Sequence, residues 1–220
     1  MTRTVPRYDE FADWYERWAG DGPGLIAVHP ELLPPLADLR VLDVASGQGR
    51  LTRYLAGAGA TVTGLDLSAA MLGKARAMGG ECIEYVQADI TRPPTWWDGR
   101  PFDGCTCDLA LMDIDDLAGT FATIAAVLRR GGWFVASVVH PCFPGNDAGC
   151  SSWPPEGYET EGWWTSPDHN PGGVRIRVGA THRKLSTILN GLLGTNLEPE
   201  RFLEPPAPVP TYLLWRCRRR

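Results

Sequence analysis

The sequence lacks the features that mark membrane-spanning, secreted or nucleic-acid-binding proteins. Its apolar runs fall short of the about 18 residues that a bilayer-spanning helix needs, and no early stretch combines basic residues, an apolar run and a cleavage site. The formal net charge of −5 provides no broad positive field, and we interpret the basic cluster at 216–220 as a solvated chain end. We therefore expect a cytoplasmic protein without membrane or nucleic-acid partners.

Signatures of metal sites and disulfides are also missing. The chain has six cysteines, and none of them forms a Cys-x-x-Cys pair. His140, Cys142, Cys150 and His169 occur in one region, but their spacing is not that of a zinc site. We expect reduced thiols and no metal ion.

The most informative pattern in the chain is a strand, a turn, a helix and a second strand over residues 41–68. Apolar residues at 41–44 predict a buried strand, the sequence Ala-Ser-Gly-Gln-Gly at 45–49 predicts a sharp turn, and a helix follows at 50–58. A second strand at 61–65 brings Asp66 to the same edge of a parallel sheet. A carboxylate there can accept two hydrogen bonds from a ribose diol, so the pattern predicts a site for a nucleotide-type cofactor.

The glycine spacing distinguishes two candidate cofactors. A dinucleotide site has the pattern Gly-x-Gly-x-x-Gly, whereas Gly47 and Gly49 are followed by Thr52 in this chain. The missing third glycine disfavours a nicotinamide dinucleotide, although a dinucleotide oxidoreductase remains an alternative. S-adenosylmethionine fits the same geometry.

Asp43, at the end of the first strand, supplies the acid that opens a known cofactor motif. With Asp43, Gly47 and Gly49, the chain resembles the class I S-adenosylmethionine-dependent methyltransferases, whose motif usually has glycine where Ala45 stands. The resemblance implies that Asp66 binds the ribose, that Asp89 meets the adenine amino group and that Ile90 packs on the adenine face. In full, it implies cofactor contacts from Asp43, Ala45, Ser46, Gly47, Gly49, Asp66, Leu67, Asp89, Ile90, Asp108 and Leu109.

The order of predicted elements indicates one α/β domain over residues 1–220. Besides the first unit, we expect helices at 69–78, 115–129 and 182–193, and strands at 83–87, 102–107, 198–203 and 211–216. A fifth strand follows the two glycines at 131 and 132. The resemblance then implies a doubly wound, mostly parallel seven-stranded sheet whose last strand is antiparallel.

Two regions lie outside this minimal fold. The N-terminal region at 1–39 has aromatic residues at helical spacing and is expected to cap the cofactor cleft, with Tyr8 as a contact. The region at 141–173 is rich in proline, glycine and tryptophan, and we interpret it as a substrate lid, because long loops in compact domains are often functional. We expect substrate contacts from Trp153, Trp163, Trp164 and His182.

The function that we predict is methyl transfer from S-adenosyl-L-methionine to an oxygen or nitrogen atom of a small molecule. His140 is the candidate base, because it ends the fifth strand and histidine titrates near neutral pH. A secondary-metabolite tailoring step follows only from analogy with the family. Alternatives are a C-methyltransferase acting on a small aromatic acceptor and a non-catalytic, cofactor-binding regulatory protein. We expect a monomer or a homodimer.

Overall fold

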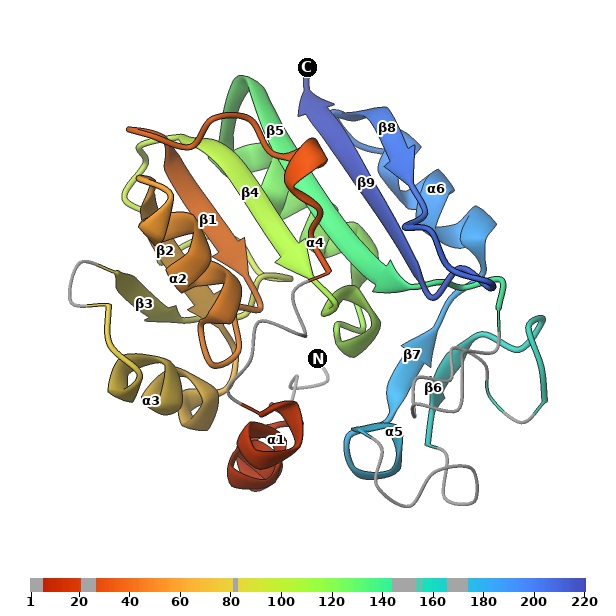
Figure 1. Ribbon diagram of the computed structural model, residues 1–220. Helices are drawn as coiled ribbons and strands as arrows, with labels where there is room; N and C mark the ends of the chain where they lie inside the picture. Colours follow the sequence, from red (N-terminus) through yellow and green to blue (C-terminus); the bar gives the residue numbers. More distant parts are fainter. Residues whose placement is uncertain (1–5, 21–26, 81–82, 144–153, 155, 166–173) are drawn as a thin grey trace.

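The computed structural model describes residues 6–20, 27–80, 83–143, 154, 156–165 and 174–220. Its centre is a seven-stranded sheet in the order β3-β2-β1-β4-β5-β9-β8 (Figure 1). The strands are β1 (Arg40–Val44), β2 (Thr61–Asp66), β3 (Glu84–Gln87), β4 (Phe102–Asp108), β5 (Leu128–Val139), β8 (Leu197–Leu203) and β9 (Tyr212–Arg219). The first five strands pair in parallel, and β9 runs antiparallel to both β5 and β8. The predicted sheet is confirmed.

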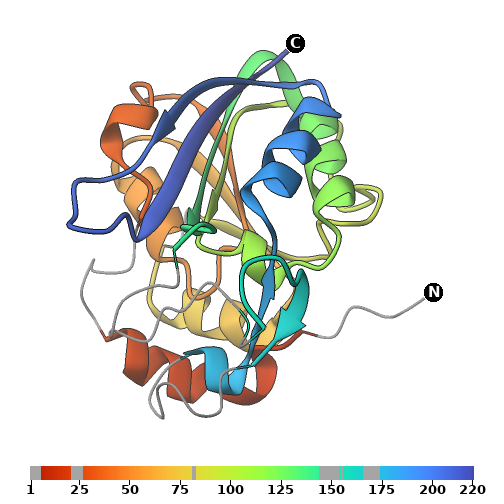
Figure 2. The ribbon, with the colours of Figure 1, turned by 90° about the vertical axis from the view of Figure 1, so that its right-hand side faces the viewer.

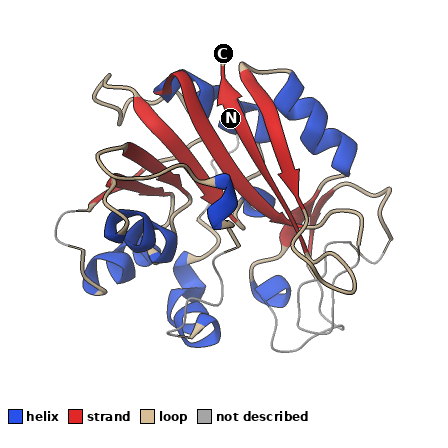
Figure 3. Ribbon diagram, turned by 45° about the horizontal axis from the view of Figure 1, so that its top comes forward, coloured by secondary structure: helices blue, strands red, loops and turns tan. Residues whose placement is uncertain are grey.

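Helices cover both faces of this sheet (Figure 3). The helix α2 (Arg50–Gly57) packs on β1 and β2, and α3 (Ala69–Ala77) packs on β2 and β3. On the opposite face, α4 (Leu117–Val127) lies against β5 and α6 (Leu185–Leu193), as Figure 2 shows. Among the described residues, no helix combines the length and apolar character that crossing a bilayer would need.

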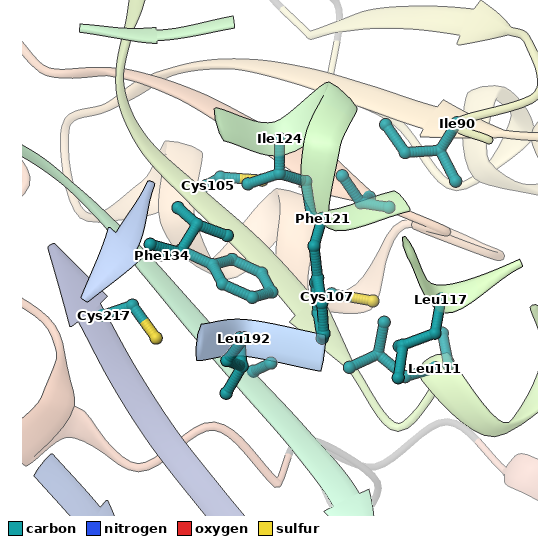
Figure 4. Close-up of a cluster of buried hydrophobic side chains, with 14 of the residues drawn as sticks. Ile90, Cys105, Cys107, Leu111, Leu117, Phe121, Ile124, Phe134, Leu192 and Cys217 are labelled. Carbon is teal, nitrogen blue, oxygen red and sulfur yellow. The ribbon is translucent and has the colours of Figure 1, made fainter. Parts of the chain in front are cut away.

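Successive residues of a strand point to opposite faces of the sheet, so their side chains pack into two separate hydrophobic cores. Val41 and Val135 pack with Leu55 of α2 on one face. Leu42 and Phe134 belong to the core on the other face. Figure 4 shows that second core, in which Phe121 and Ile124 of α4 and Leu192 of α6 cover Cys105, Cys107 and Phe134. Burial of the two thiols raises their pKa well above its usual value, so they are apolar fillers.

Apart from the turn before β1, which packs on β5 and β9, the remaining elements lie at the carboxyl ends of the parallel strands (Figure 1). The helix α1 (Ala12–Ala19) follows a short 3-10 turn, η1 (Asp9–Phe11), and another such turn, η2 (Pro30–Leu32), precedes β1. A further 3-10 turn, η3 (Leu111–Asp113), follows β4. A two-stranded sheet of β6 (Gly162–Trp164) and β7 (Ala180–His182) stands beside α5 (Val174–Arg177).

The structure corrects three sequence-based expectations. His182 belongs to β7, so the last helix begins at Leu185 and not at residue 182. The one-turn helix α5 was not predicted, because four residues are too few to show a period. The arginines at 216–219 are part of β9 and not a solvated end: Arg216 and Arg218 both pair with Glu200, and the terminal Arg220 pairs with Glu198 on β8.

Candidate active site

A cavity lies at the carboxyl ends of β1, β2 and β4 and is lined in addition by side chains of α1 and α5. Parallel strands present such a crevice where the chain leaves each strand for a helix. The structure brings most of the predicted cofactor residues together here. The cavity lining includes Tyr8, Asp43, Ala45, Ser46, Gly47, Asp66, Leu67, Asp89, Ile90, Asp108 and Leu109.

The turn between β1 and α2 has an unusual backbone that explains its glycines. Ala45, Gly47 and Gly49 have φ of 54°, 54° and 77°, in the left-handed region that L side chains rarely adopt. A Cβ on Gly49 would also lie 2.3 Å from the Tyr85 hydroxyl oxygen. Gly49 is not among the described residues that line the cavity, so its part in the turn is steric.

Asp66 ties the end of β2 to this turn. Its Oδ2 accepts a hydrogen bond from the Gly47 backbone N–H at 2.8 Å, and its Oδ1 accepts one from the Ser68 N–H, also at 2.8 Å. Each carboxylate oxygen has a second lone pair, so the group retains capacity for a ligand. Burial raises the pKa of Asp66 to about 6.

Asp43 is 1% exposed and lies beneath the turn. The hydroxyls of Thr52 and Thr106 donate to its two carboxylate oxygens, at 2.6 and 2.8 Å. Burial raises its pKa to about 7, because neither hydroxyl carries a charge that would compensate for lost hydration. A positively charged ligand would supply that compensation.

Asp108, at the end of β4, accepts hydrogen bonds from one side-chain hydroxyl and from two backbone N–H groups. The Ser137 hydroxyl and the Val28 N–H donate to its Oδ1, and the Ala27 N–H donates to its Oδ2. Burial raises its pKa as well. In the described part of the chain, no lysine or arginine forms an ion pair with Asp43, Asp66 or Asp108, so this side of the cavity is a negative pole suited to a cation.

Comparisons with known proteins agree with this geometry. A family model described as a methyltransferase domain matches residues 42–136. A crystal structure of an S-adenosylmethionine dependent methyltransferase from Mesorhizobium loti has 30% sequence identity and a TM-score of 0.69, over 90% of this chain and 100% of that one. The chain belongs to the class I S-adenosylmethionine-dependent methyltransferase family.

Two curated relatives of this methyltransferase chain carry more specific names. A ubiquinone biosynthesis O-methyltransferase from Thiobacillus denitrificans is 36% identical over 108 residues, 48% of this chain and 47% of that protein. A malonyl-[acyl-carrier protein] O-methyltransferase from Pectobacterium atrosepticum is 35% identical over 130 residues, 59% and 47% of the two chains. The chain thus spans about half the length of these relatives.

The N-terminal segment closes one side of the methyltransferase cavity. Tyr15 and Trp18 of α1 line the cavity, although the sequence indicated only Tyr8 of this region as a contact. Lys74 of α3 holds this helix through Asp13 and Glu16, each at 2.7 Å. These two side chains join Tyr8 in the cavity lining, and the capping role of the N-terminal region stays a prediction.

Two further residues of the cavity, Asp113 and Arg175, could not be predicted as site residues from the sequence. Asp113 ends η3 and Arg175 lies on α5, and they form an ion pair of 3.2 Å with little solvent exposure. The Tyr8 hydroxyl donates to Asp113 at 3.0 Å. No motif could indicate them, because the three residues come from segments about 60 to 100 positions apart.

The structure places the predicted base and lid residues elsewhere. His140 is not among the described cavity residues; its Nε2 lies 2.7 Å from Glu204 Oε1 and its Nδ1 accepts from the Cys142 N–H. Its role as base stays a prediction without geometric support. The same cavity lining lacks Trp163, which is 55% exposed beside Arg7, and Trp164, which is buried in the core.

His182 lines a second, smaller cavity and not the first. This cavity adjoins the first one, because Val139 and Arg175 line both. The Nε2 of His182 lies 2.8 Å from the Tyr158 carbonyl oxygen. Trp153 lies outside the described residues, as do all of residues 144–153, 155 and 166–173 of the lid expected at 141–173.

Proposed function

We propose that this protein transfers the methyl group of S-adenosylmethionine to an oxygen or nitrogen atom of a small molecule. The observation that carries the proposal is the negative pole formed by Asp43, Asp66 and Asp108 at the motif positions of the family. The sulfonium and ammonium groups of the cofactor are cations, and burial next to three carboxylates without ion-pair partners favours them over a neutral or anionic ligand. The names of the two curated relatives favour oxygen as the acceptor atom.

The cofactor assignment follows the cavity lining. Asp66 would bind the ribose hydroxyls, and Asp43 and Asp108 would face the methionine end. Ile90, which is 5% exposed, would pack on the adenine. Asp89 would meet the adenine amino group while its Oδ1 accepts from the Thr91 N–H at 2.9 Å, a contact that fixes the carboxylate's direction.

Methyl transfer from a sulfonium is an in-line displacement, so the protein must mainly orient the acceptor and exclude water. Tyr8, Tyr15 and Trp18 line the cavity from the N-terminal segment, next to Asp113, which contacts Tyr8, and Arg175. This lining supports a small acceptor in place of a macromolecule. Arg216 and Arg218 of β9 pair with Glu200, and Arg220 pairs with Glu198, so these arginines are less available to nucleic acid.

Calorimetric titration with S-adenosylmethionine, S-adenosylhomocysteine and NAD tests the cofactor part. We expect micromolar binding of the first two and none of NAD. Release of S-adenosylhomocysteine on a panel of hydroxyl, amine and carboxylate acceptors then tests the reaction. Binding of NAD alone would restore the oxidoreductase alternative, and cofactor binding without turnover on any acceptor would favour the non-catalytic one.

A further inference from the structure

The acceptor side of the cavity contains carboxylates that the cofactor motifs do not use. An acceptor hydroxyl must lose its proton when its oxygen takes the methyl group, and a base within hydrogen-bond reach speeds this step. His140 is not among the described cavity residues, so the base must be sought among groups that are. Among the residues that the structure describes, the carboxylates that line the cavity outside the motif positions are Asp113 and Asp115.

Asp113 is oriented from two sides. Arg175 of α5 donates to its Oδ1 at 3.2 Å, and Tyr8 of the N-terminal segment donates to its Oδ2 at 3.0 Å. Its side chain is only 15% exposed. Because each carboxylate oxygen can accept two hydrogen bonds, these contacts fix the carboxylate's direction and still leave room for an acceptor hydroxyl.

Hydrogen bonds also fix the backbone around Asp113. Leu109, at the end of β4, has a φ of 50°, and η3 starts two residues later. Arg183 donates to the carbonyl oxygens of Leu111 at 2.8 Å and of Asp115 at 2.7 Å, and also to that of Ile114. A catalytic group needs such a fixed support, because small misplacements cost much of the rate.

Asp115 provides a comparison with Asp113 within the same cavity. It lies two residues away and lines the same cavity, but its side chain is 59% exposed and forms an ion pair with Arg7. An exposed carboxylate is a weak base for a buried reaction, because solvent stabilises its charge. The two aspartates therefore differ in burial and orientation and not in chemistry.

The surroundings of Asp113 keep it basic. Burial raises its pKa above the usual value, against the lowering effect of Arg175, Tyr8 and Arg7. The charge of Asp113 in turn contributes to raising the pKa of Asp66 on β2 and of Tyr15 on α1, after the larger effect of burial. A carboxylate with a raised pKa takes up a proton more readily than a solvated one.

We infer that Asp113 is the catalytic base, and that the acceptor class is a small molecule with an ionisable hydroxyl. The inference rests on the proposed function and names its acceptor chemistry. The acceptor oxygen forms a bond to the methyl carbon, and the carbon–sulfur bond breaks with its electron pair returning to sulfur. The hydroxyl proton moves to an oxygen of Asp113, and Tyr8 and Arg175 position that carboxylate.

The experiment compares Asp113→Asn with Asp115→Asn, the same chemical change in the same cavity. The probe acceptors are catechol, whose hydroxyl is protonated at neutral pH, and 4-nitrocatechol, whose more acidic hydroxyl is largely ionised. We expect Asp113→Asn to lower kcat on catechol by about 100-fold or more and on 4-nitrocatechol by less than about tenfold. Asp115→Asn should change kcat by the same factor on both probes and by less than about tenfold, because an exposed carboxylate does not take the hydroxyl proton.

Two readouts separate a base from a purely structural carboxylate. The acidic limb of the kcat/KM profile on catechol should disappear in Asp113→Asn, because it reports the base of the free enzyme. Affinity for S-adenosylmethionine should stay within about threefold by calorimetry, since the amide can still accept from Tyr8. Asp113→Glu, which keeps a carboxylate, should recover part of the catechol rate if the amide variant folds poorly.

Equal losses on the two catechols, or an unchanged pH profile, would overturn the inference and leave the proposed function intact. So would a wild-type enzyme that methylates carboxylate or amine acceptors but no hydroxyl compound, catechols included. Cofactor binding without transfer to any acceptor would instead refute the proposed function, and the inference with it.

Discussion

The proposed cofactor side and the proposed acceptor side of the cavity are built in different ways. The proposed cofactor side comes from residues 43–108, where Asp43, Asp66 and Asp108 lie at the carboxyl ends of parallel strands. The acceptor side joins Arg7 and Tyr8 to Asp113 and Asp115 and to Arg175, through ion pairs and hydrogen bonds over long sequence separations. Local patterns can therefore reveal the first side, whereas the second exists only after folding.

The acceptor side should depend on long-range contacts for its stability. Arg183→Ala removes three hydrogen bonds from a charged, mostly buried side chain to the carbonyls around η3. We expect a loss of about 2–3 kcal/mol in the free energy of unfolding, and a thermal midpoint lower by roughly 5–10 °C. Thermal and urea unfolding measure the change.

Arg100→Ala is the matched control, because Arg100 is 79% exposed and pairs only with neighbouring Asp98. It should change stability by less than about 0.5 kcal/mol. Equal losses of stability in the two arginine variants would show that the hydrogen bonds of Arg183 do not specially stabilise the acceptor side.

The cofactor side should respond most to Asp66. Asp66→Ala removes the proposed ribose contacts and also the two bonds that hold the Gly47 turn and Ser68. We expect at least about tenfold weaker binding of S-adenosylmethionine by calorimetry. Asp98→Ala, remote from the cavity, should bind normally, and unchanged affinity of the Asp66 variant would remove Asp66 from the site.

The negative pole should make cofactor binding pH-dependent. Burial raises the pKa of Asp43 to about 7 and of Asp66 to about 6, so both become protonated as the pH falls from 8 to 5.5. Protonation removes the charges that attract a cation, and affinity for S-adenosylmethionine should fall by about tenfold over this range.

S-adenosylhomocysteine serves as the control ligand, because it lacks the sulfonium charge. Its affinity should fall less over the same pH range. Parallel pH curves for the two ligands would mean that the carboxylates do not sense the sulfonium.

The smallest effect concerns the one position where the chain departs from the family motif. Ala45 has a φ of 54°, a conformation that costs a non-glycine residue about 1–2 kcal/mol. Ala45→Gly should therefore stabilise the protein by about 1 kcal/mol and raise the thermal midpoint by roughly 2–4 °C. Ala58→Gly, at a φ of −88°, should instead be neutral or slightly destabilising, and a stabilisation of both variants would contradict the strain argument.

Prediction from sequence succeeded where a structural signal is local. The strands β1, β2 and β4 match the predicted positions closely, and so does the start of α3 at Ala69, where the Ser68 hydroxyl accepts from the Met71 N–H. The strand β7 and the helix α5 escaped prediction, because three or four residues show neither alternation nor a helical period. His140 is a candidate base because of its place at the end of a strand. The sequence does not indicate that Glu204 lies beside it.

The sequence by itself determined the sheet, the glycine turn and the carboxylates of the cofactor side, because strand ends and turns are encoded by neighbouring residues. Only the tertiary structure decided which face of α1 lines the cavity, which arginines are paired, and that Asp113 meets Tyr8 and Arg175. Those contacts join residues that are distant in the chain, and burial then changes their chemistry. A short sequence pattern indicates neither which residues become neighbours nor which charged groups lose their hydration on burial.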